Sequence, residues 1–277
     1  MNITKFEDSI KKTIKDYKLI DKKDKVLVAC SGGKDSTTVL YLLHKFGYNV
    51  QAGIIDLQIK PFSETNLNNL KKFCKENKIK LNIFDFRKEF GFGFCYIRSI
   101  LDSKNIKLNS CTICGILRRY LMNKKARQLK FTKIATGHNL DDEAQTILMN
   151  QFKGNIKLNA KLGPSTGVFK DKKFIPRIKP LYFTKENDIR EYSKLKNFPV
   201  NYEPCPCSVM AYRRSVRGIF SKYDINKENI VKSFIKILPE LKNFYKNEKI
   251  NYCTNCGEPT PKGECKTCQL IKKLNSS

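Results

Sequence analysis

The chain has 277 residues and a formal net charge of +28, from 54 Lys and Arg side chains and 26 Asp and Glu side chains. This length accommodates one medium α/β domain with small appendages and disfavours two large independent domains. The charge predicts a polyanionic partner; since no apolar run approaches the ~20 residues that span a bilayer and the N-terminus lacks the apolar core of a signal peptide, we expect a cytoplasmic protein that binds nucleic acid and no membrane.

The hydrophobic pattern predicts strands alternating with helices over the first half of the chain. Residues 5–20 carry apolar side chains at helical spacing, namely Phe6, Ile10, Ile14 and Tyr17. Strands and helices then alternate over residues 25–30, 36–46, 49–56, 65–77 and 80–86. This alternation is typical of an α/β fold whose doubly wound parallel sheet has helices on both faces and binds its ligand beyond the carboxyl ends of the strands.

The rest of the chain adds helices, one more strand and a cysteine-rich end. We predict a helix from Cys111 to about Gln128, a strand over 131–136, and a helix that follows the segment 137–143. Residues 153–187 contain several Gly and Pro with nine basic and two acidic side chains, which indicates an irregular loop able to contact phosphate. Further helices are expected over 185–197 and 226–247.

The run from Lys25 to Ser36 joins a buried strand directly to a glycine turn. Gly32 and Gly33 let the backbone turn tightly so that its amides face an anion. Lys34 and Ser36 add donors, and the following helix directs its positive dipole end to the same place. The spacing differs from that of a Walker loop, whose glycines lie farther apart. We interpret the run as an ATP site, with an ordinary strand-to-helix turn as the alternative.

The eleven cysteines are expected to be metal ligands or reactive groups, because the cytosol keeps thiols reduced. Near the C-terminus, two Cys-x-x-Cys pairs are separated by eight residues, at Cys253, Cys256, Cys265 and Cys268. Four thiolates close a tetrahedral structural zinc site, and a segment too small to bury its own core would be held together by the metal. Disulfide pairing is the alternative.

A separate pair, Cys111 and Cys114, opens a predicted helix next to Arg118 and Arg119. We expect the helix dipole and the positive charges to lower the pKa of these thiols. Cys205, within Cys205-Pro206-Cys207, is a candidate third ligand. Three thiolates suit an iron–sulfur cluster with one iron free of protein ligands, or a zinc with an open position. A persulfide-forming dithiol and a purely structural role are the alternatives.

Together these motifs resemble the tRNA 2-thiolation enzymes of the PP-loop (adenine nucleotide alpha hydrolase-like) superfamily, over roughly residues 10–220. The resemblance rests on the Ser-Gly-Gly-Lys-Asp-Ser loop, Cys111-x-x-Cys114, the segment 136–144, and Cys205-Pro206-x-Ser208 followed by Arg213 and Arg217. The chain looks most similar to the NcsA-type thiolases of the wobble uridine. The TtuA group, which thiolates the T-loop uridine, shares nearly all these motifs. TtcA, the cytidine thiolase, usually shows a second Cys-x-x-Cys, from which Cys205-Pro206-Cys207 is one residue short.

The resemblance implies a tRNA sulfurtransferase that works in two steps with ATP and Mg²⁺. ATP adenylates a tRNA uridine, at wobble position 34 or alternatively at position 54, and sulfur then displaces AMP to give 2-thiouridine. Lys34 and Asp142 are the implied catalytic residues of the activation step, together with Cys111, Cys114 and Cys205 for sulfur transfer. The implied ATP-binding residues are Ala29, Cys30, Ser31, Gly32, Gly33, Lys34, Asp35, Ser36, Ile55, Asp56, Arg118, Gly137 and Asp142.

The resemblance also implies cofactors, partners and a division of the chain. Cys111, Cys114 and Cys205 would hold a 4Fe-4S cluster, while a persulfide on one cysteine resolved by another is the older interpretation. Expected partners are tRNA, contacted through Lys153–Lys185 and Arg213–Arg217, a second copy in a homodimer, and a sulfur donor: sulfide, a ubiquitin-like thiocarboxylate protein or a desulfurase. The expected parts are an N-terminal helix (1–22), a PP-loop ATP pyrophosphatase domain (23–222), a helical connector (223–249) and a zinc ribbon (250–277).

The sequence departs from the family pattern at two places. Family members commonly begin with a zinc-binding module, whereas no cysteine precedes Cys30 here, so we expect that module to be absent. Cys207 stands where the family often has an aromatic residue, and it is a candidate ligand or sulfur acceptor. The alternative functions are a PP-loop adenylating ligase, which needs no reactive cysteine, and a noncatalytic RNA-binding zinc protein.

Overall fold

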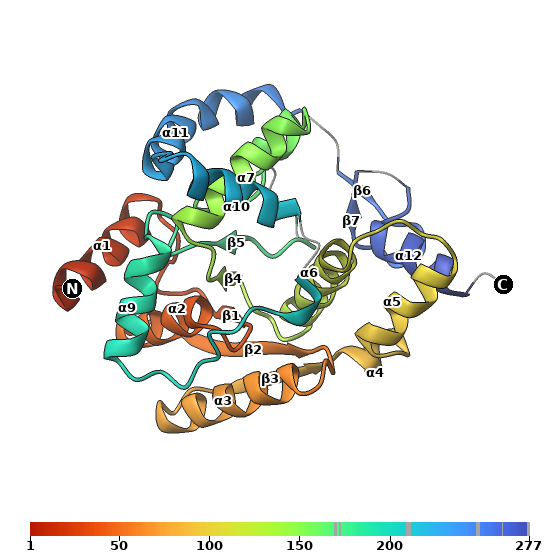
Figure 1. Ribbon diagram of the computed structural model, residues 1–277, viewed down its shortest axis with the longest axis horizontal. Helices are drawn as coiled ribbons and strands as arrows, with labels where there is room; N and C mark the ends of the chain where they lie inside the picture. The colour runs from red at the N-terminus through yellow and green to blue at the C-terminus, as the bar shows by residue number, and fades with distance from the viewer. Residues whose placement is uncertain (169–170, 172, 209–211, 248–249, 262, 276–277) are drawn as a thin grey trace.

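The computed structural model describes residues 1–168, 171, 173–208, 212–247, 250–261 and 263–275. Its centre is a five-stranded parallel sheet with the strand order β3-β2-β1-β4-β5 (Figure 1). The strands are β1 (Val26–Cys30), β2 (Val50–Asp56), β3 (Leu81–Asp85), β4 (Lys133–Thr136) and β5 (Arg177–Ile178). The strand order reverses at β1, between β2 and β4, and such a switch point leaves a crevice at the carboxyl ends of the strands. The predicted doubly wound α/β sheet is confirmed.

Four helices cover one face of the sheet: α1 (Ile3–Asp16), α2 (Lys34–Lys45), α3 (Phe62–Glu76) and α9 (Glu186–Leu195). Val26, Val28 and Cys30 of β1 point to this face, because alternate residues of a strand share a side. They join a buried cluster with apolar side chains from all four helices. Helix α1 ends at Asp16 rather than near residue 20, because Lys18 takes a positive φ of 47°.

The opposite face carries α4 (Phe86–Phe90), α5 (Phe94–Ser103), α6 (Ser110–Gln128) and α12 (Lys266–Asn275). Leu27 of β1 and Ile134 of β4 pack there. Helices α4 and α5 lie outside the elements predicted from the sequence. The Asp85 side chain ends β3 by capping α4, accepting a hydrogen bond of 2.9 Å from the Lys88 backbone N–H.

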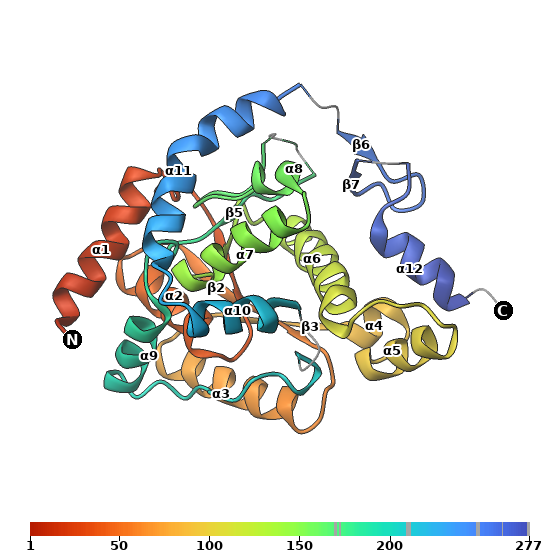
Figure 2. The ribbon, with the colours of Figure 1, turned by 45° about the horizontal axis from the view of Figure 1, so that its top comes forward.

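A third group of helices lies above β5 in Figure 1, and its α7 and α10 lie in front of the sheet in Figure 2. The group consists of α7 (Leu140–Phe152), α10 (Tyr212–Lys222) and α11 (Lys227–Phe244). Their apolar side chains surround the fully buried Tyr182. The prediction that residues 153–187 form an irregular loop is wrong in part, because this stretch contains α8 (Ile156–Asn159) and the edge strand β5. No helix in the described part of the chain combines the length and apolarity needed to cross a membrane.

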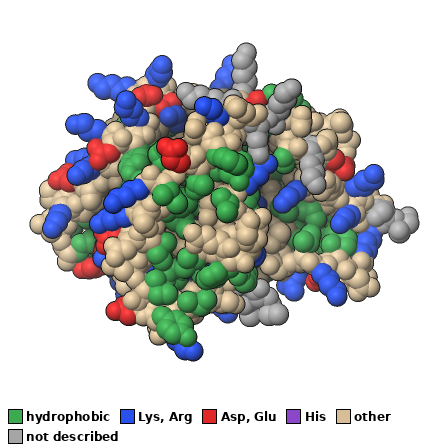
Figure 3. Space-filling model, turned by 90° about the horizontal axis from the view of Figure 1, so that it is seen from above, with side chains coloured by type: hydrophobic (Ala, Val, Ile, Leu, Met, Phe, Trp, Pro, Cys, Tyr) green, Lys and Arg blue, Asp and Glu red, His purple; other side chains and the backbone are tan. Residues whose placement is uncertain are grey.

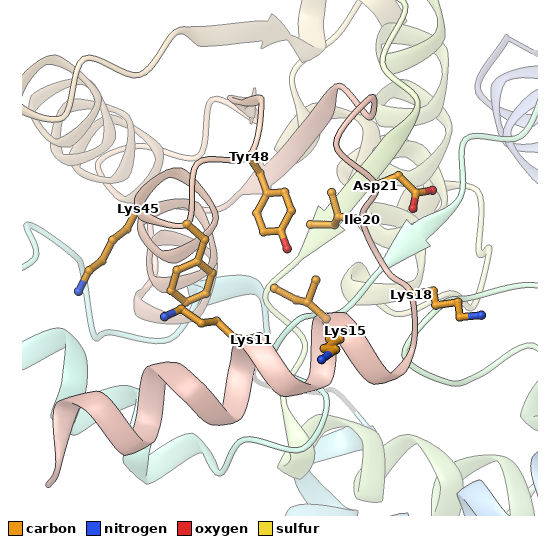
Figure 4. Close-up of a pocket in the computed structure, with 9 residues that line it drawn as sticks. Lys11, Lys15, Lys18, Ile20, Asp21, Lys45 and Tyr48 are labelled. Atoms are coloured by element: carbon orange, nitrogen blue, oxygen red, sulfur yellow. The ribbon is translucent and has the colours of Figure 1, made fainter.

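At the amino-terminal edge of the sheet, α1 and the turn after α2 enclose a cavity of about 720 Å³ (Figure 4). Four lysines line it with one acidic residue, Asp21, the lysines being Lys11, Lys15, Lys18 and Lys45. Lys45 is tied to the buried Glu7 of α1, with its Nζ 2.7 Å from Glu7 Oε2. This ion pair holds α1 against α2.

The C-terminal module consists of the short antiparallel pair β6 (Asn251–Tyr252) and β7 (Pro259–Thr260), followed by α12. Glu258 of the module is buried against α6, where it accepts a hydrogen bond of 2.8 Å from Asn123 Nδ2 and pairs with Arg127. Leu270 and Leu274 of α12 join the core on this face of the sheet. The module is thus packed on the α/β core through α6.

Candidate active site

The glycine turn lies between β1 and α2, at the carboxyl edge of the sheet. Gly33 precedes the first residue of α2, and no side chain caps the helix, so the amides of its first turn are available to an anion. Gly32 has a φ of +79°, and a Cβ there would lie 2.5 Å from Cβ of Asn66. Only glycine fits that position. The Ser31 backbone N–H donates to Ser36 Oγ at 3.1 Å, which closes the turn.

A second turn, between β4 and α7, packs directly on the first. A Cβ at Gly137 would lie 2.6 Å from the backbone nitrogen of Ser36, so this position also requires glycine. Asn139 caps α7 in a capping box with Asp142, and its Nδ2 donates to Asp35 Oδ1 at 3.1 Å. The turns after β1 and β4 therefore form one unit.

A cavity of about 580 Å³ opens beside these two turns, and the cysteine motifs reach it as well. The predicted site residues in its wall are Ala29, Ser31, Asp35, Ser36, Ile55, Cys111, Cys114, Arg118, Gly137, Asp142 and Cys205. Cys207 lines it too. Segments far apart in the chain thus bring the glycine turn and the predicted cluster cysteines to one cavity.

Other predicted ATP-site residues lie behind the wall of this cavity. The Cys30 thiol is fully buried in the core, and burial raises its pKa. Asp56, at the end of β2, accepts a hydrogen bond of 2.9 Å from the Gln58 backbone N–H. Gly32 and Gly33 contribute backbone rather than side chains.

Lys34 is nearly buried between two carboxylates. Its Nζ lies 3.0 Å from Asp35 Oδ2 and 2.9 Å from Glu186 Oε1. Burial alone would lower the pKa of Lys34, but the two carboxylates outweigh burial and raise that pKa. The ammonium group is therefore charged and already placed at the turn. Nothing in the sequence links Glu186 to Lys34, and Glu186 is not among the predicted site residues.

Cys111 and Cys114 lie in the first turns of α6, whose N-cap is Asn109. Cys205 precedes a short 3₁₀ turn (Pro206–Ser208), and Cys111 Sγ lies 3.9 Å from the Cys207 carbonyl oxygen. The prediction of lowered thiol pKa values was wrong. Burial raises the pKa of both Cys111 and Cys114, with a further contribution from Cys205, and the nearby arginines offset this only in part.

The cavity thiols and the C-terminal thiols differ in spacing. Within the described part of the chain, the C-terminal four are the one group of three or more His, Cys, Asp or Glu residues whose ligand atoms all lie within 4.8 Å of one another. A tetrahedral zinc with Zn–S bonds of about 2.3 Å needs such spacing. Burial opposes ionisation of Cys253, but backbone amides including that of Cys265 outweigh it and lower its pKa to about 6. This cluster therefore fits one metal ion.

Asp142 and His138 lie at the mouth of the cavity beside α10. Asp142 Oδ1 accepts a hydrogen bond of 2.7 Å from Arg213 Nη1. His138 is exposed on the cavity wall, where partial desolvation lowers its pKa and outweighs the opposing effect of Asp142; the cations Lys179, Arg213 and Arg177 lower it further. The ring is thus neutral at pH 7, and its Nδ1 lies 2.9 Å from Thr136 Oγ1.

Besides Glu186, sequence reasoning missed Asn139 in this site, and it included Arg177 only as part of the basic stretch Lys153–Lys185. Asn139 could have been found, because Asn followed three residues later by an acidic residue signals a helix N-terminus. Arg177 carries no such signal, since it belongs to a strand of two residues. Both Arg119 and Arg177 line the cavity.

Comparisons with known proteins match this arrangement. A family described as a PP-loop domain matches residues 2–217. The chain is 33% identical to a tRNA-5-methyluridine(54) 2-sulfurtransferase from Pyrococcus horikoshii, over 98% of this chain and 86% of the relative. It is 32% identical to cytoplasmic tRNA 2-thiolation protein 1 from Caenorhabditis elegans, over 98% of this chain and 73% of the relative.

Among solved structures, the U34-tRNA thiolase NcsA from Methanococcus maripaludis, determined with its [4Fe-4S] cluster, superposes with a TM-score of 0.80 at 27% sequence identity. The match covers 99% of this chain and 89% of that one. Both the sequence relatives and this structure agree with the resemblance drawn from the loop and the cysteines. The chain therefore belongs to the PP-loop family of tRNA 2-sulfurtransferases.

Proposed function

We propose that this enzyme thiolates a tRNA uridine in two steps within the 580 Å³ cavity. ATP first adenylates the C2 oxygen of the uridine and releases pyrophosphate, and a sulfur nucleophile then displaces AMP to leave 2-thiouridine. The observation that carries the proposal is that the anion-binding turn and Cys111, Cys114 and Cys205 line one cavity. An activated uridine formed there would meet sulfur without leaving the site.

The residues of the two turns fit the activation step. The free amides of the first turn of α2 would hold the phosphates, and Lys34 would stabilise charge on the departing pyrophosphate. Asp35 and Asp142 are the carboxylates in the cavity wall, and they would hold Mg²⁺, which balances phosphate charge. Ile55, Arg118 and the Gly137 backbone would frame the nucleotide.

The three cavity cysteines fit a 4Fe-4S cluster better than a single metal ion. Their sulfur atoms are not all as close together as one zinc requires, whereas an iron–sulfur cluster is larger and accepts thiolates from separate segments. The Methanococcus thiolase carries such a cluster. When bound, it would supply an iron free of protein ligands for a sulfur ligand. Protein purified without oxygen should be brown, with broad absorption near about 400 nm that is lost in Cys114→Ala; a colourless protein after iron reconstitution would favour a persulfide.

The activity test is direct. Anaerobic protein incubated with ATP, sulfide and unmodified tRNA should yield 2-thiouridine by mass spectrometry of the nucleosides, and Cys111→Ala should not. ATP turnover that gives no thiolated product even in the parental protein, and that is unchanged in Cys111→Ala, would favour an adenylating ligase. If no tRNA elicits pyrophosphate release, the protein acts by binding RNA alone.

For the modified position, we propose wobble uridine 34, because the solved thiolase that superposes well on this chain acts on U34. A second candidate is position 54, which is the site named for the Pyrococcus relative at 33% identity. Nuclease mapping of the thiolated fragment distinguishes the two, since the anticodon and T-loop fragments differ in mass.

For tRNA binding we propose Lys153–Lys185 and Arg213–Arg217. Lys179 does not contribute, because its Nζ lies 2.7 Å from the buried Glu143, and Lys170 and Lys172 lie outside the described residues. Arg214 is exposed. On the face seen in Figure 3, Lys and Arg side chains lie mostly around the margins of a largely apolar centre. Reversing charge at Arg214 should weaken tRNA binding and flatten its dependence on salt. Equal affinity at all salt concentrations would contradict this assignment.

We further propose zinc in the C-terminal cluster, a cytoplasmic location and a homodimer. Exposed apolar side chains of α7, α8 and α11 would form the dimer contact, namely Phe152, Ile156, Leu158, Ile237 and Phe244. Light scattering should give twice the chain mass of 32.1 kDa.

The sulfur donor would be sulfide, a ubiquitin-like thiocarboxylate protein or a desulfurase, and Cys207 would serve as an additional sulfur acceptor.

A further inference from the structure

Two arginines, Arg119 of α6 and Arg177 of β5, stand side by side in the wall of the 580 Å³ cavity. Arg177 Nη2 donates a hydrogen bond of 3.1 Å to the Arg119 carbonyl oxygen, and its guanidinium carbon lies 5.3 Å from the Phe174 ring centroid. Arg119 lies against Gly115, where a Cβ would be 3.1 Å from Arg119 Nη1. The absence of a side chain at residue 115 leaves space for this guanidinium.

Neither arginine has a carboxylate partner in the described part of the chain. Lys34 and Arg213 are paired, with Glu186 and Asp142 respectively, whereas Arg118 in the same wall lies beside Cys114. Burial and their mutual repulsion lower the pKa of Arg177 to about 10, and burial together with Arg118 lowers that of Arg119. Two guanidinium groups that share a cavity wall without a carboxylate partner repel each other, and a phosphate that accepts hydrogen bonds from both would relieve that repulsion.

The position of the pair indicates which phosphate it takes. Arg119 and Arg177 also line a second cavity of about 400 Å³, between α6 and the C-terminal module. That cavity presents the rings of Tyr120 and Phe174 with the ammonium of Lys266, groups that suit a nucleotide strand. The phosphates of ATP already have the amides of the turn before α2. The arginines therefore stand where a strand would pass from the module toward the cysteines.

We propose that Arg119 and Arg177 together bind one phosphodiester of the RNA strand whose uridine enters the cavity. This inference rests on the proposed tRNA thiolation and deepens it, because it assigns a binding site for the backbone next to the reacting base. The pair fixes the strand in register and leaves recognition of the base to other groups.

The test is binding of an unmodified tRNA transcript to the full chain, without ATP, over about 50 to 200 mM salt. Arg119→Gln and Arg177→Gln should each weaken binding about tenfold at the low end, as expected for lost hydrogen bonds to a charged group. Each should reduce the slope of log K against log salt by about 0.9, and the double variant should reduce it no further, because one phosphate is shared. The control Arg190→Gln removes the same charge from exposed α9 and should leave the slope unchanged.

Two further measurements distinguish an RNA phosphate site from an ATP phosphate site and from a folding defect. Affinity for a nonhydrolysable ATP analogue, measured by calorimetry, should stay unchanged; a tenfold loss there with an unchanged tRNA slope would assign the phosphate to ATP and overturn the proposal. Arg119→Lys and Arg177→Lys keep the charge and should keep the slope while losing part of the affinity, which a folding defect would not produce. Arginine-dependent tRNA binding without any 2-thiouridine formed would contradict the proposed function and leave this phosphate site standing.

Discussion

Asn139 connects two turns of the active site, because its side chain caps α7 and donates a hydrogen bond of 3.1 Å to Asp35 in the first turn of α2. Asp35 also lies 3.0 Å from Lys34 Nζ. Burial raises the pKa of Asp35, and Lys34 and Asn139 oppose this rise. Asn139 therefore positions a carboxylate that faces the nucleotide cavity.

We predict that Asn139→Ala lowers the free energy of unfolding by about 1 to 2 kcal/mol through the lost cap and also slows pyrophosphate release. Asn226→Ala is the matched control, because Asn226 caps α11 in the same way but touches no residue of the cavity wall. Urea unfolding and a pyrophosphate assay measure the two effects. Equal activity in both variants would show that the bond to Asp35 has no functional role.

Gly137→Ala should abolish ATP-dependent turnover, because the new Cβ would lie 2.6 Å from the Ser36 backbone nitrogen and displace the anion-binding turn. Gly218→Ala serves as the control, since a Cβ there meets nothing within 4 Å and the position lies inside α10. That control should gain up to about 1 kcal/mol in stability, as expected for alanine in a helix. A Gly137→Ala protein that binds ATP normally by calorimetry would refute the close packing of the two turns.

Lys34→Met should reduce the rate of tRNA-dependent pyrophosphate release by about 10²-fold or more, because its ammonium lies at the glycine turn that would hold the phosphates. The comparison is Lys232→Met, which removes an exposed ammonium that pairs with Glu228 at 3.1 Å and lies outside the cavity wall and the proposed tRNA-binding segments. Rapid-quench assays at saturating ATP measure the step. If both variants release pyrophosphate at the parental rate, the assignment of Lys34 to the leaving group is wrong.

Cys265→Ser should reduce bound zinc from about one ion per chain to none, because a structural site needs all four thiolates. Cys95→Ser removes an exposed thiol elsewhere and should leave the zinc content unchanged. Atomic absorption gives the metal, and limited proteolysis reports whether the module stays folded. A Cys265→Ser protein with full zinc content would mean that the metal binds outside this cluster.

Glu7→Gln should lower the free energy of unfolding by about 1.5 to 3 kcal/mol at pH 7, because Glu7 accepts hydrogen bonds from Lys45 and Tyr192. Burial would raise the pKa of Glu7, but those two partners outweigh it and hold the pKa below its ordinary value of 4.5. The contribution is therefore fully present above pH 4.5 and is lost as the pH falls through the lowered pKa. Urea unfolding from pH 7 to pH 3 should show the two proteins converging, whereas a constant difference would exclude the ion pair as its cause.

Local signals made the turn before α2 predictable, because its glycines, its donors and the adjoining strand and helix all lie within one short run. The helix α5 could have been found, since Phe94, Ile97 and Leu101 recur at helical spacing and are buried. The glycines around Phe92 conceal that pattern. The strand β5, Arg177–Ile178, is too short to carry any alternation.

Thiol pKa values and long-range ion pairs could not be predicted from the sequence, because they depend on the folded environment. The convergence of Cys205 with Cys111 could be inferred from ligand chemistry, but the pKa values of the thiols could not, because their burial is set by tertiary packing. The same is true of the pairing between Lys34 and Glu186, which lie 152 positions apart. The residue types indicated which side chains could bind metal or phosphate. The protonation of the thiols and of Lys34 depends on tertiary packing, which the sequence does not show.

Helix α6 connects the C-terminal module with the cysteines of the cavity. Its 19 residues form one continuous rod of about 28 Å, with Cys111 at one end and Arg127, which pairs with the C-terminal module, at the other. A rigid helix cannot tilt at one end and stay still at the other. Because the same helix holds both contacts, the position of the module on α6 and the positions of Cys111 and Cys114 are set together, whereas Cys205 is placed by a separate segment.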